Sequence, residues 1–189
     1  MAIRPLPVIA ASAASLTLAA LLRRWCRGRP PVASEPVIPP CESVVPTEVL
    51  QALFSPHLVF LGSPPQPISS MSFPDPAGQA AWPAATQQRR CWWGIPNSDG
   101  SVSIDLLVLP ATAMSTLQSA LAGSSFTHEV IVGRDAYWTM VPSELSDYYQ
   151  FYAFIGPIWI SVGTSGVDTA RAAASVAVAT LAAANPGIG

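Results

Sequence analysis

Lysine is absent from the chain, and charged residues of any kind are scarce. All nine basic residues are arginines, and charged residues make up only 11% of the 189 positions. Five arginines lie in the first thirty residues, so residues 41–189 carry four arginines against ten acids, a net charge of about −6. An acidic segment with four scattered arginines is a poor match for a phosphate backbone. We therefore expect no nucleic-acid partner.

Histidine is nearly as scarce, because His57 and His128 are the only two in the sequence. Neither has a cysteine or a second histidine at the spacing of a zinc site, and no glycine-rich phosphate loop occurs. The sequence "GTSG" at 163–166 could present N–H groups to an anion, although a serine-capped turn is the commoner use of such a sequence. We therefore expect no metal ion and no cofactor.

The first forty residues differ in composition from the rest. Residues 6–22 form an uncharged run, short for a membrane span and longer than most signal h-regions, so we assign 1–27 as a signal or anchor segment. Residues 28–40 are rich in proline, which favours an extended linker. Residues 41–189 remain for one folded domain with its own core. The membrane is thus an expected partner through the N-terminal segment.

The three cysteines bear on the compartment. Cys26 belongs to the anchor segment, whereas Cys41 opens the domain and Cys91 lies fifty residues further on, so Cys41 and Cys91 are the natural disulfide pair. The arginines around the uncharged run favour the opposite topology, with the domain facing the cytoplasm. We give more weight to the cysteines and expect an extracytoplasmic domain, anchored or secreted, with the cytoplasm-facing anchor as the alternative.

Cys91 also allows a second interpretation, as a catalytic thiolate. Arg89 and Arg90 precede it and would lower the pKa of a free thiol. A nucleophile usually needs a positioned base, however, and no spacing in the sequence brings a histidine to it. We therefore favour the disulfide and name no catalytic residue.

Hydrophobic periodicity predicts an α+β domain. The expected fold is a single, mostly antiparallel sheet with helices packed on one face, β-β-α-like units and one disulfide. Ser165 or Asp168 is placed to cap the last helix. The expected elements, in order, are a helix over 44–54, a strand at 57–62, a loop over 63–88, a hairpin of 89–95 and 101–109, a helix over 110–123, hairpins over 126–141 and 148–163, and a helix over 165–184.

Aromatic residues gather in the predicted strands. Adjacent rings on a strand point to opposite faces of the sheet, which leaves two interpretations. Either both faces of the sheet are covered, or one face presents an aromatic patch to a lipid, glycan or protein. The candidate binding surface comprises Trp82, Trp92, Trp93, Trp138, Tyr149 and Trp159.

Several of these motifs occur in a recognisable order. They are "CESVVPTEVLQALF" at 41–54, "CWWG" at 91–94, "GRDAYW" at 133–138, "IWISVG" at 158–163 and "VDTARAAASVAVATL" at 167–181. In this order they resemble a group of actinobacterial exported proteins of unknown function, many of them lipid-anchored. The resemblance implies export, an α+β domain and the Cys41–Cys91 disulfide, and it brings no catalytic residues.

These observations favour a non-enzymatic, membrane-tethered or secreted protein of the cell envelope that acts by binding a protein partner or complex. The alternative is a carrier or binder of a hydrophobic ligand such as a lipid, held between sheet and helix by aromatic side chains. A third alternative is a hydrolase that uses His57 or His128. It predicts a histidine beside a nucleophile and a carboxylate.

Overall fold

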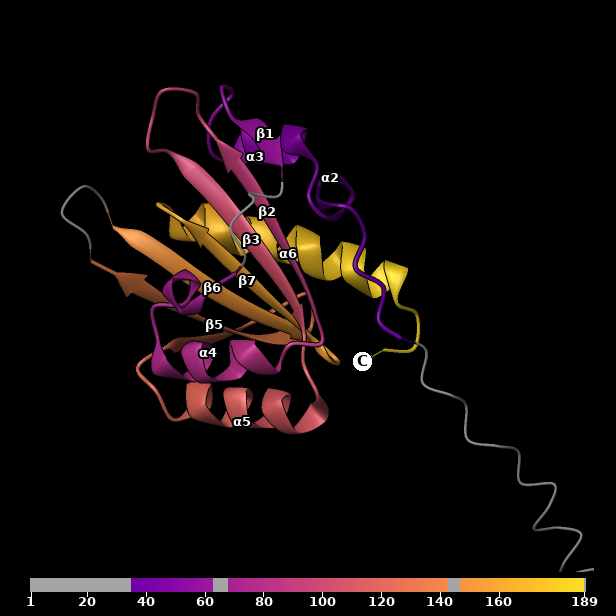
Figure 1. Cartoon of the computed structure of the whole chain (residues 1–189). Coiled ribbons are helices and arrows are strands. Elements are labelled where there is room, and N and C mark those ends of the chain that lie inside the picture. Colours follow the sequence, from indigo (N-terminus) through magenta and orange to yellow (C-terminus); the bar gives the residue numbers. More distant parts are fainter. Residues whose placement is uncertain (1–34, 63–67, 143–146, 189) are drawn as a thin grey trace, which may run out of the picture. The chain divides into compact units, whose positions relative to one another are not determined.

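The computed structural model of the protein describes residues 35–62, 68–142 and 147–188. The predicted signal or anchor segment and most of the linker lie outside these residues. From Pro36 onward the described residues form one compact unit, in which a seven-stranded sheet carries five α-helices (Figure 1). This arrangement confirms the predicted α+β class with a single antiparallel sheet.

The strands pair antiparallel throughout, in the order β1-β2-β3-β7-β6-β5-β4. Their bounds are β1 Val59–Gly62, β2 Gln87–Gly94, β3 Ser101–Val108, β4 Thr127–Ile131, β5 Arg134–Val141, β6 Tyr148–Ile155 and β7 Ile158–Thr164. The three predicted hairpins are β2–β3, β4–β5 and β6–β7. The pairing of β3 with β7 joins the two halves of the chain into one sheet, and β1 and β4 form its edges.

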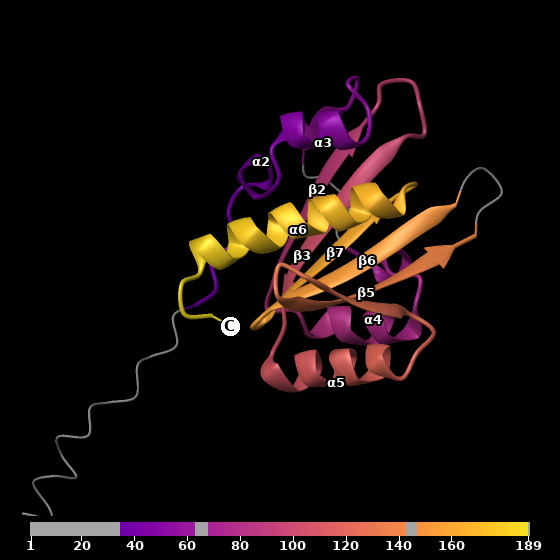
Figure 2. The same ribbon diagram turned by 180° about the vertical axis from the view of Figure 1, so that it is seen from behind.

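Helices cover both faces of this sheet, which corrects the expectation of a single covered face (Figure 1 and Figure 2). The α-helices are α2 Cys41–Val44, α3 Thr47–Leu53, α4 Pro76–Ala81, α5 Ala111–Ala122 and α6 Val167–Ala184, with 3₁₀ turns η1 Ser70–Ser72 and η2 Trp82–Ala84. One face carries α2, α3 and α6, and the other carries α4 and α5. The physical reason lies in the central strands, because every residue of β7 is buried and both of its faces need cover.

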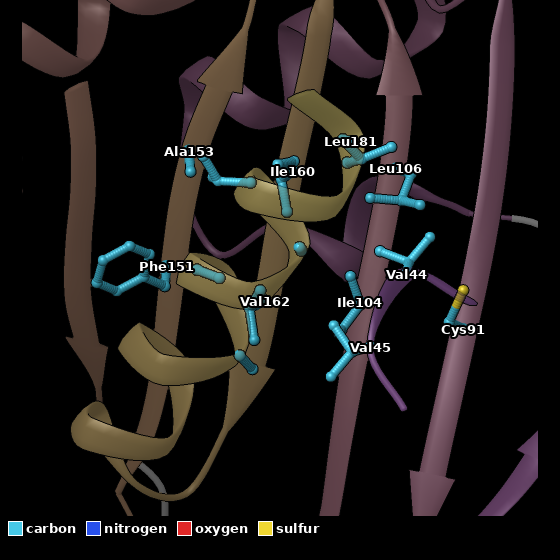
Figure 3. Close-up of a cluster of buried hydrophobic side chains, with 14 of the residues drawn as sticks. Val44, Val45, Cys91, Ile104, Leu106, Phe151, Ala153, Ile160, Val162 and Leu181 are labelled. Carbon is cyan, nitrogen blue, oxygen red and sulfur yellow. The ribbon is translucent and has the colours of Figure 1, made fainter. Parts of the chain in front are cut away.

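The helix α6 packs on the sheet through its smallest side chains. Ala170, Ala173, Ala174 and Ala177 follow the spacing of one helix face and are fully buried. Side chains from β3, β6 and β7 gather beneath the helix (Figure 3). Among the described residues, α6 is the one helix long and apolar enough to suit a membrane span. Its packing on β6 and β7 gives it the role of a core helix.

The opposite face is covered by part of the segment that we predicted to be a loop. Within residues 68–88, Phe73 is buried with its ring centroid 4.5 Å from that of Trp159. Asp75 caps α4, because its Oδ1 accepts a hydrogen bond of 2.7 Å from the Gly78 backbone N–H. The prediction of a loop over 63–88 is therefore wrong for η1, α4 and η2, whose short length hid their periodicity.

Two helix ends also differ from the prediction. The helix expected over 44–54 is interrupted at Val45, which is extended because it precedes Pro46, and α3 starts after that proline. The N-cap of α6 is Gly166, and no side chain caps it. The expected cap by Ser165 or Asp168 is therefore wrong.

The turn between β4 and β5 places a β-branched residue in the left-handed region. Val132 has φ of 49° and Gly133 has φ of 71° in a two-residue turn. Such turns favour Asn-Gly, and a valine there is strained. We expect Val132→Asn to raise the free energy of unfolding by about 1 kcal/mol, measured by urea denaturation. Val130→Asn, an equally exposed change within β4, is the control and should give no gain.

Candidate functional site: a polar groove on one face of the sheet

The disulfide between Cys41 and Cys91 is formed, as predicted. The S–S distance is 2.07 Å and the Cα–Cα distance is 5.4 Å. It joins α2 to β2, and the Trp93 Nε1 donates a hydrogen bond of 3.0 Å to the Thr47 Oγ1 nearby. The bond excludes Cys91 as a thiolate in this state, and it indicates an oxidising, extracytoplasmic environment.

The six aromatic residues of the candidate binding surface do not form one patch. Trp93 and Trp159 are fully buried, so their assignment to a surface is wrong. Trp138 and Tyr149 lie half-buried on the α6 face, with ring centroids 6.2 Å apart. Trp82 is half-buried beside the α4 and α5 core, while Trp92 is 40% exposed on that same side. Of the six, Trp92 is therefore the ring that an external ligand can reach most readily.

Trp92 stands at a groove on the face that α4 and α5 cover only in part. The groove has a volume of about 880 Å³ and runs over β2, β3 and β6, beside the η1 turn. Its lining consists of Ser69, Met71, Ser72, Pro74, Arg90, Trp92, Ser101, Ser103, Asp105, Val141, Tyr148 and Gln150. Most of these side chains are polar, in contrast to the aromatic core that continues beneath α4 and α5. The groove is therefore the best candidate for a functional site in the described part of the chain.

An ion pair forms the centre of the groove. Two guanidinium nitrogens of Arg90 donate hydrogen bonds to the two carboxylate oxygens of Asp105, Nε to Oδ1 at 2.7 Å and Nη2 to Oδ2 at 2.8 Å. The two residues face each other across β2 and β3, and Arg90 also donates to the Ser72 hydroxyl. Burial raises the pKa of Asp105, and the Arg90 hydrogen bonds oppose that shift. The pair is thus a fixed, neutral unit of the site.

Gln150, on β6, also lines the groove. Its Nε2 donates to the Ser161 Oγ at 2.6 Å and to the Val162 carbonyl at 3.3 Å. Among the described residues its Oε1 has no hydrogen-bond partner, and the side chain is only 1% exposed. A buried acceptor without a donor costs about 1–3 kcal/mol, and burial keeps this oxygen from a ligand in the groove.

Tyr148 lies flat on the sheet because a glycine leaves room for it. A Cβ atom at Gly163 would stand 1.6 Å from the Tyr148 hydroxyl, so no other residue fits there without displacing the ring. The Tyr148 hydroxyl lies 3.4 Å from the Ser103 Oγ. Gly163 is the first residue of the "GTSG" sequence, and its lack of a side chain leaves space for the Tyr148 ring.

The two histidines lie elsewhere. The His128 Nε2 is 2.9 Å from the Asp135 Oδ1 on the exposed β4–β5 hairpin, and its ring contacts Tyr137. His57 makes a hydrogen bond of 3.3 Å to the Ser55 Oγ through its backbone N–H. The His128 ring therefore contacts a carboxylate, whereas His57 contacts the Ser55 hydroxyl through its backbone and not through its imidazole ring. The described residues also contain no cluster of three His, Cys, Asp or Glu side chains suited to a metal ion.

Buried tyrosines make the fold sensitive to alkali. Burial raises the pKa of Tyr152 well above 10.0, and Asp75, whose Oδ2 accepts its hydroxyl at 2.5 Å, raises it further. Above pH 10 the unfolded chain therefore loses a proton that the folded chain retains, and the free energy of unfolding falls as pH rises. We expect a slope of about 1.4 kcal/mol per pH unit for each such tyrosine.

Urea denaturation from about pH 8 to about pH 11 measures this slope. Tyr152→Phe removes the ionisable group and should give a shallower slope, whatever its stability at the lower pH. An unchanged slope would contradict the assignment to Tyr152. The matched control is Tyr149→Phe, because Tyr149 is half-buried and its ring is partly exposed to water.

Sequence reasoning singled out Trp92 but missed the rest of the groove. Arg90 was considered only as a neighbour of Cys91, and Gln150 and Ser103 carry no motif. Polar residues at alternate positions of central strands are the one signal that was present. Asp105 in "SVSIDLLVL" is the one charged residue of its strand, between Ile104 and Leu106, and it is 3% exposed, so a buried partner was predictable for it.

Comparison of the chain with family models, with curated proteins and with solved structures finds no match. No relative therefore supplies a function for the groove. Its chemistry has to be inferred from its own side chains.

Proposed function

We propose that the chain is a non-enzymatic protein of the cell envelope, exported and held at the membrane by its N-terminal segment, and that it acts by binding through the groove. The observation that carries this is the construction of the groove, where the hydrogen bonds between Arg90 and Asp105 fix both side chains and the exposed ring of Trp92 lines the same groove. A volume of about 880 Å³ is within the range of small-molecule sites. The resemblance to actinobacterial exported proteins agrees with this assignment.

Binding fits the groove better than hydrolysis does. Among the described lining residues, Asp105 is the only carboxylate, and both of its oxygens accept hydrogen bonds from Arg90. A general acid or base must be free to exchange a proton with substrate. The one carboxylate among the described lining residues is therefore engaged as a recognition group and is not free for proton transfer.

A protein partner is the second candidate, favoured by the edges of the sheet. β4 is an edge strand, and Val130 within it is 62% exposed. Edge strands present unpaired backbone groups with which an extended segment of another protein can pair. A lipid carrier receives less support, because Phe73, Tyr152 and Trp159 pack on one another where its pocket was expected.

Site-specific photo-crosslinking in cells tests these candidates. A photoreactive residue replaces Trp92 in the groove or Val130 on the edge strand, one at a time, in the full chain. Crosslinks to a defined envelope component from position 92 support the groove, and those from position 130 alone support the edge. Crosslinks from neither position would refute binding through either surface.

The compartment has its own test. A membrane-impermeant thiol reagent is applied to intact cells before and after reduction. If the domain is extracytoplasmic, Cys41 and Cys91 become labelled only after reduction. Labelling that requires permeabilised cells would instead support the cytoplasm-facing alternative.

A further inference from the structure

The groove carries no net charge that a ligand can use. Among its described lining residues, Arg90 and Asp105 are the only charged side chains, and each satisfies the other. Arginine recognises phosphate and carboxylate through the same two-pronged geometry that Asp105 already occupies here. An anionic ligand would have to displace Asp105 and leave a buried carboxylate unpaired. Charge complementarity therefore favours a neutral ligand.

The hydrogen-bonding groups of the groove are of the kind that bind hydroxyls. Ser101, Ser103 and Tyr148 line it with hydroxyl groups, each able to donate and to accept. Ser103 is the register partner of Trp92 across β2 and β3, and its Oγ lies 3.4 Å from both the Tyr148 hydroxyl and the Gly163 carbonyl oxygen. A hydroxyl oxygen has two lone pairs, so these groups can still accept a hydrogen bond from a hydroxyl of the ligand.

One side of the groove is apolar and flat. The ring of Trp92 is 40% exposed, and the side chain of Met71, 94% exposed, lies at the groove as well. An indole is a large, rigid surface with low conformational entropy, suited to stacking against a flat apolar face. Sugar rings combine such a face, made of C–H groups, with hydroxyls at their rim.

From these features we infer that the groove binds a neutral sugar, with one face of the ring on Trp92 and its hydroxyls on Ser101 and Ser103 of the neighbouring strand. This inference rests on the proposed function and names its ligand class. The same sugar chemistry is presented by a free oligosaccharide and by the headgroup of a glycolipid. The experiment therefore has one arm for each source.

The full chain, purified with its disulfide intact, is titrated with maltose, cellobiose and lactose in the first arm. The second arm uses phosphatidylcholine vesicles with and without a monogalactosyl lipid. We expect saturable binding in the first arm, or binding in the second arm that requires the galactosyl lipid. Trp92→Leu should weaken this binding about tenfold or more. Trp138→Leu, a half-buried tryptophan on the opposite face, should leave it unchanged.

Ser103→Ala removes the hydroxyl on the register partner of Trp92 and should weaken binding as well. Inorganic phosphate is the charged probe and should not compete. Preference for phosphate, binding that survives Trp92→Leu, or no binding of any neutral sugar at millimolar concentration would each overturn the inference. A defined crosslink from position 92 without sugar binding would refute this inference while the proposed function stands.

Discussion

Removal of the disulfide is expected to lower the free energy of unfolding by about 4 kcal/mol in the chain-entropy model. The relevant variant is Cys41→Ala with Cys91→Ala. The cross-link spans 50 residues, and its loss releases that loop in the unfolded chain. Both cysteines are buried, and alanine adds no polar group to the core. The free energy of unfolding of a typical domain is about 5–15 kcal/mol, so a loss of this size is a large share of it.

Urea denaturation of the full chain, with and without reductant, measures the effect. Reductant should destabilise the wild type and leave the double variant unaffected, whereas Cys26→Ala should keep the full response to reductant. Equal stability of the wild type in both conditions would show that α2 and β2 are held by packing alone.

The sequence predicted the sheet well because its strands are marked by local patterns. The alternation of Val102, Ile104 and Leu106, followed by the spacing of Met114 and Leu117, indicated β3 and α5 within a few residues of their observed bounds. The disulfide was predictable from the position of two cysteines in a chain whose sequence predicts export. Each of these inferences needed only neighbours in sequence or a count of residues.

The groove was not predictable, because it depends on which strands become neighbours. The Arg90–Asp105 pair lies within the predicted β2–β3 hairpin, and Tyr148 and Gly163 lie within the predicted β6–β7 hairpin. Ser103 meets Tyr148 and Gly163 only because β3 pairs with β7. That pairing skips four intervening elements, and no local pattern specifies it. The site is therefore a consequence of topology, which periodicity alone does not give.

The ion pair at the groove offers the second large effect. Arg90→Met is expected to lower the free energy of unfolding by about 3–5 kcal/mol, because it leaves a buried carboxylate without a partner. The side chain of Asp105 is only 4% exposed and that of Arg90 is 21% exposed, so water screens the pair weakly. Arg90→Met with Asp105→Leu removes both charges and should recover most of the loss.

The pH dependence of the stability of Arg90→Met distinguishes this explanation from a simple loss of packing. Without Arg90, burial is left to raise the pKa of Asp105 unopposed, since the hydrogen bonds that lower it are gone. The variant can then bury a neutral carboxyl group as the pH falls, so its deficit relative to wild type should shrink at acid pH. If the loss of stability relative to the wild type does not change with pH, Arg90 stabilises the fold through the packing of its aliphatic carbons and not through its charge.

A second arginine provides the matched control. Arg171 also makes a close pair, with the Nε to Glu129 Oε1 distance at 2.7 Å, but its side chain is 36% exposed. Arg171→Met should therefore cost no more than about 1 kcal/mol and show no comparable dependence on pH. If the two arginine variants were equally destabilised, burial would not distinguish the pairs. The centre of the groove would then be an ordinary surface ion pair rather than a built site.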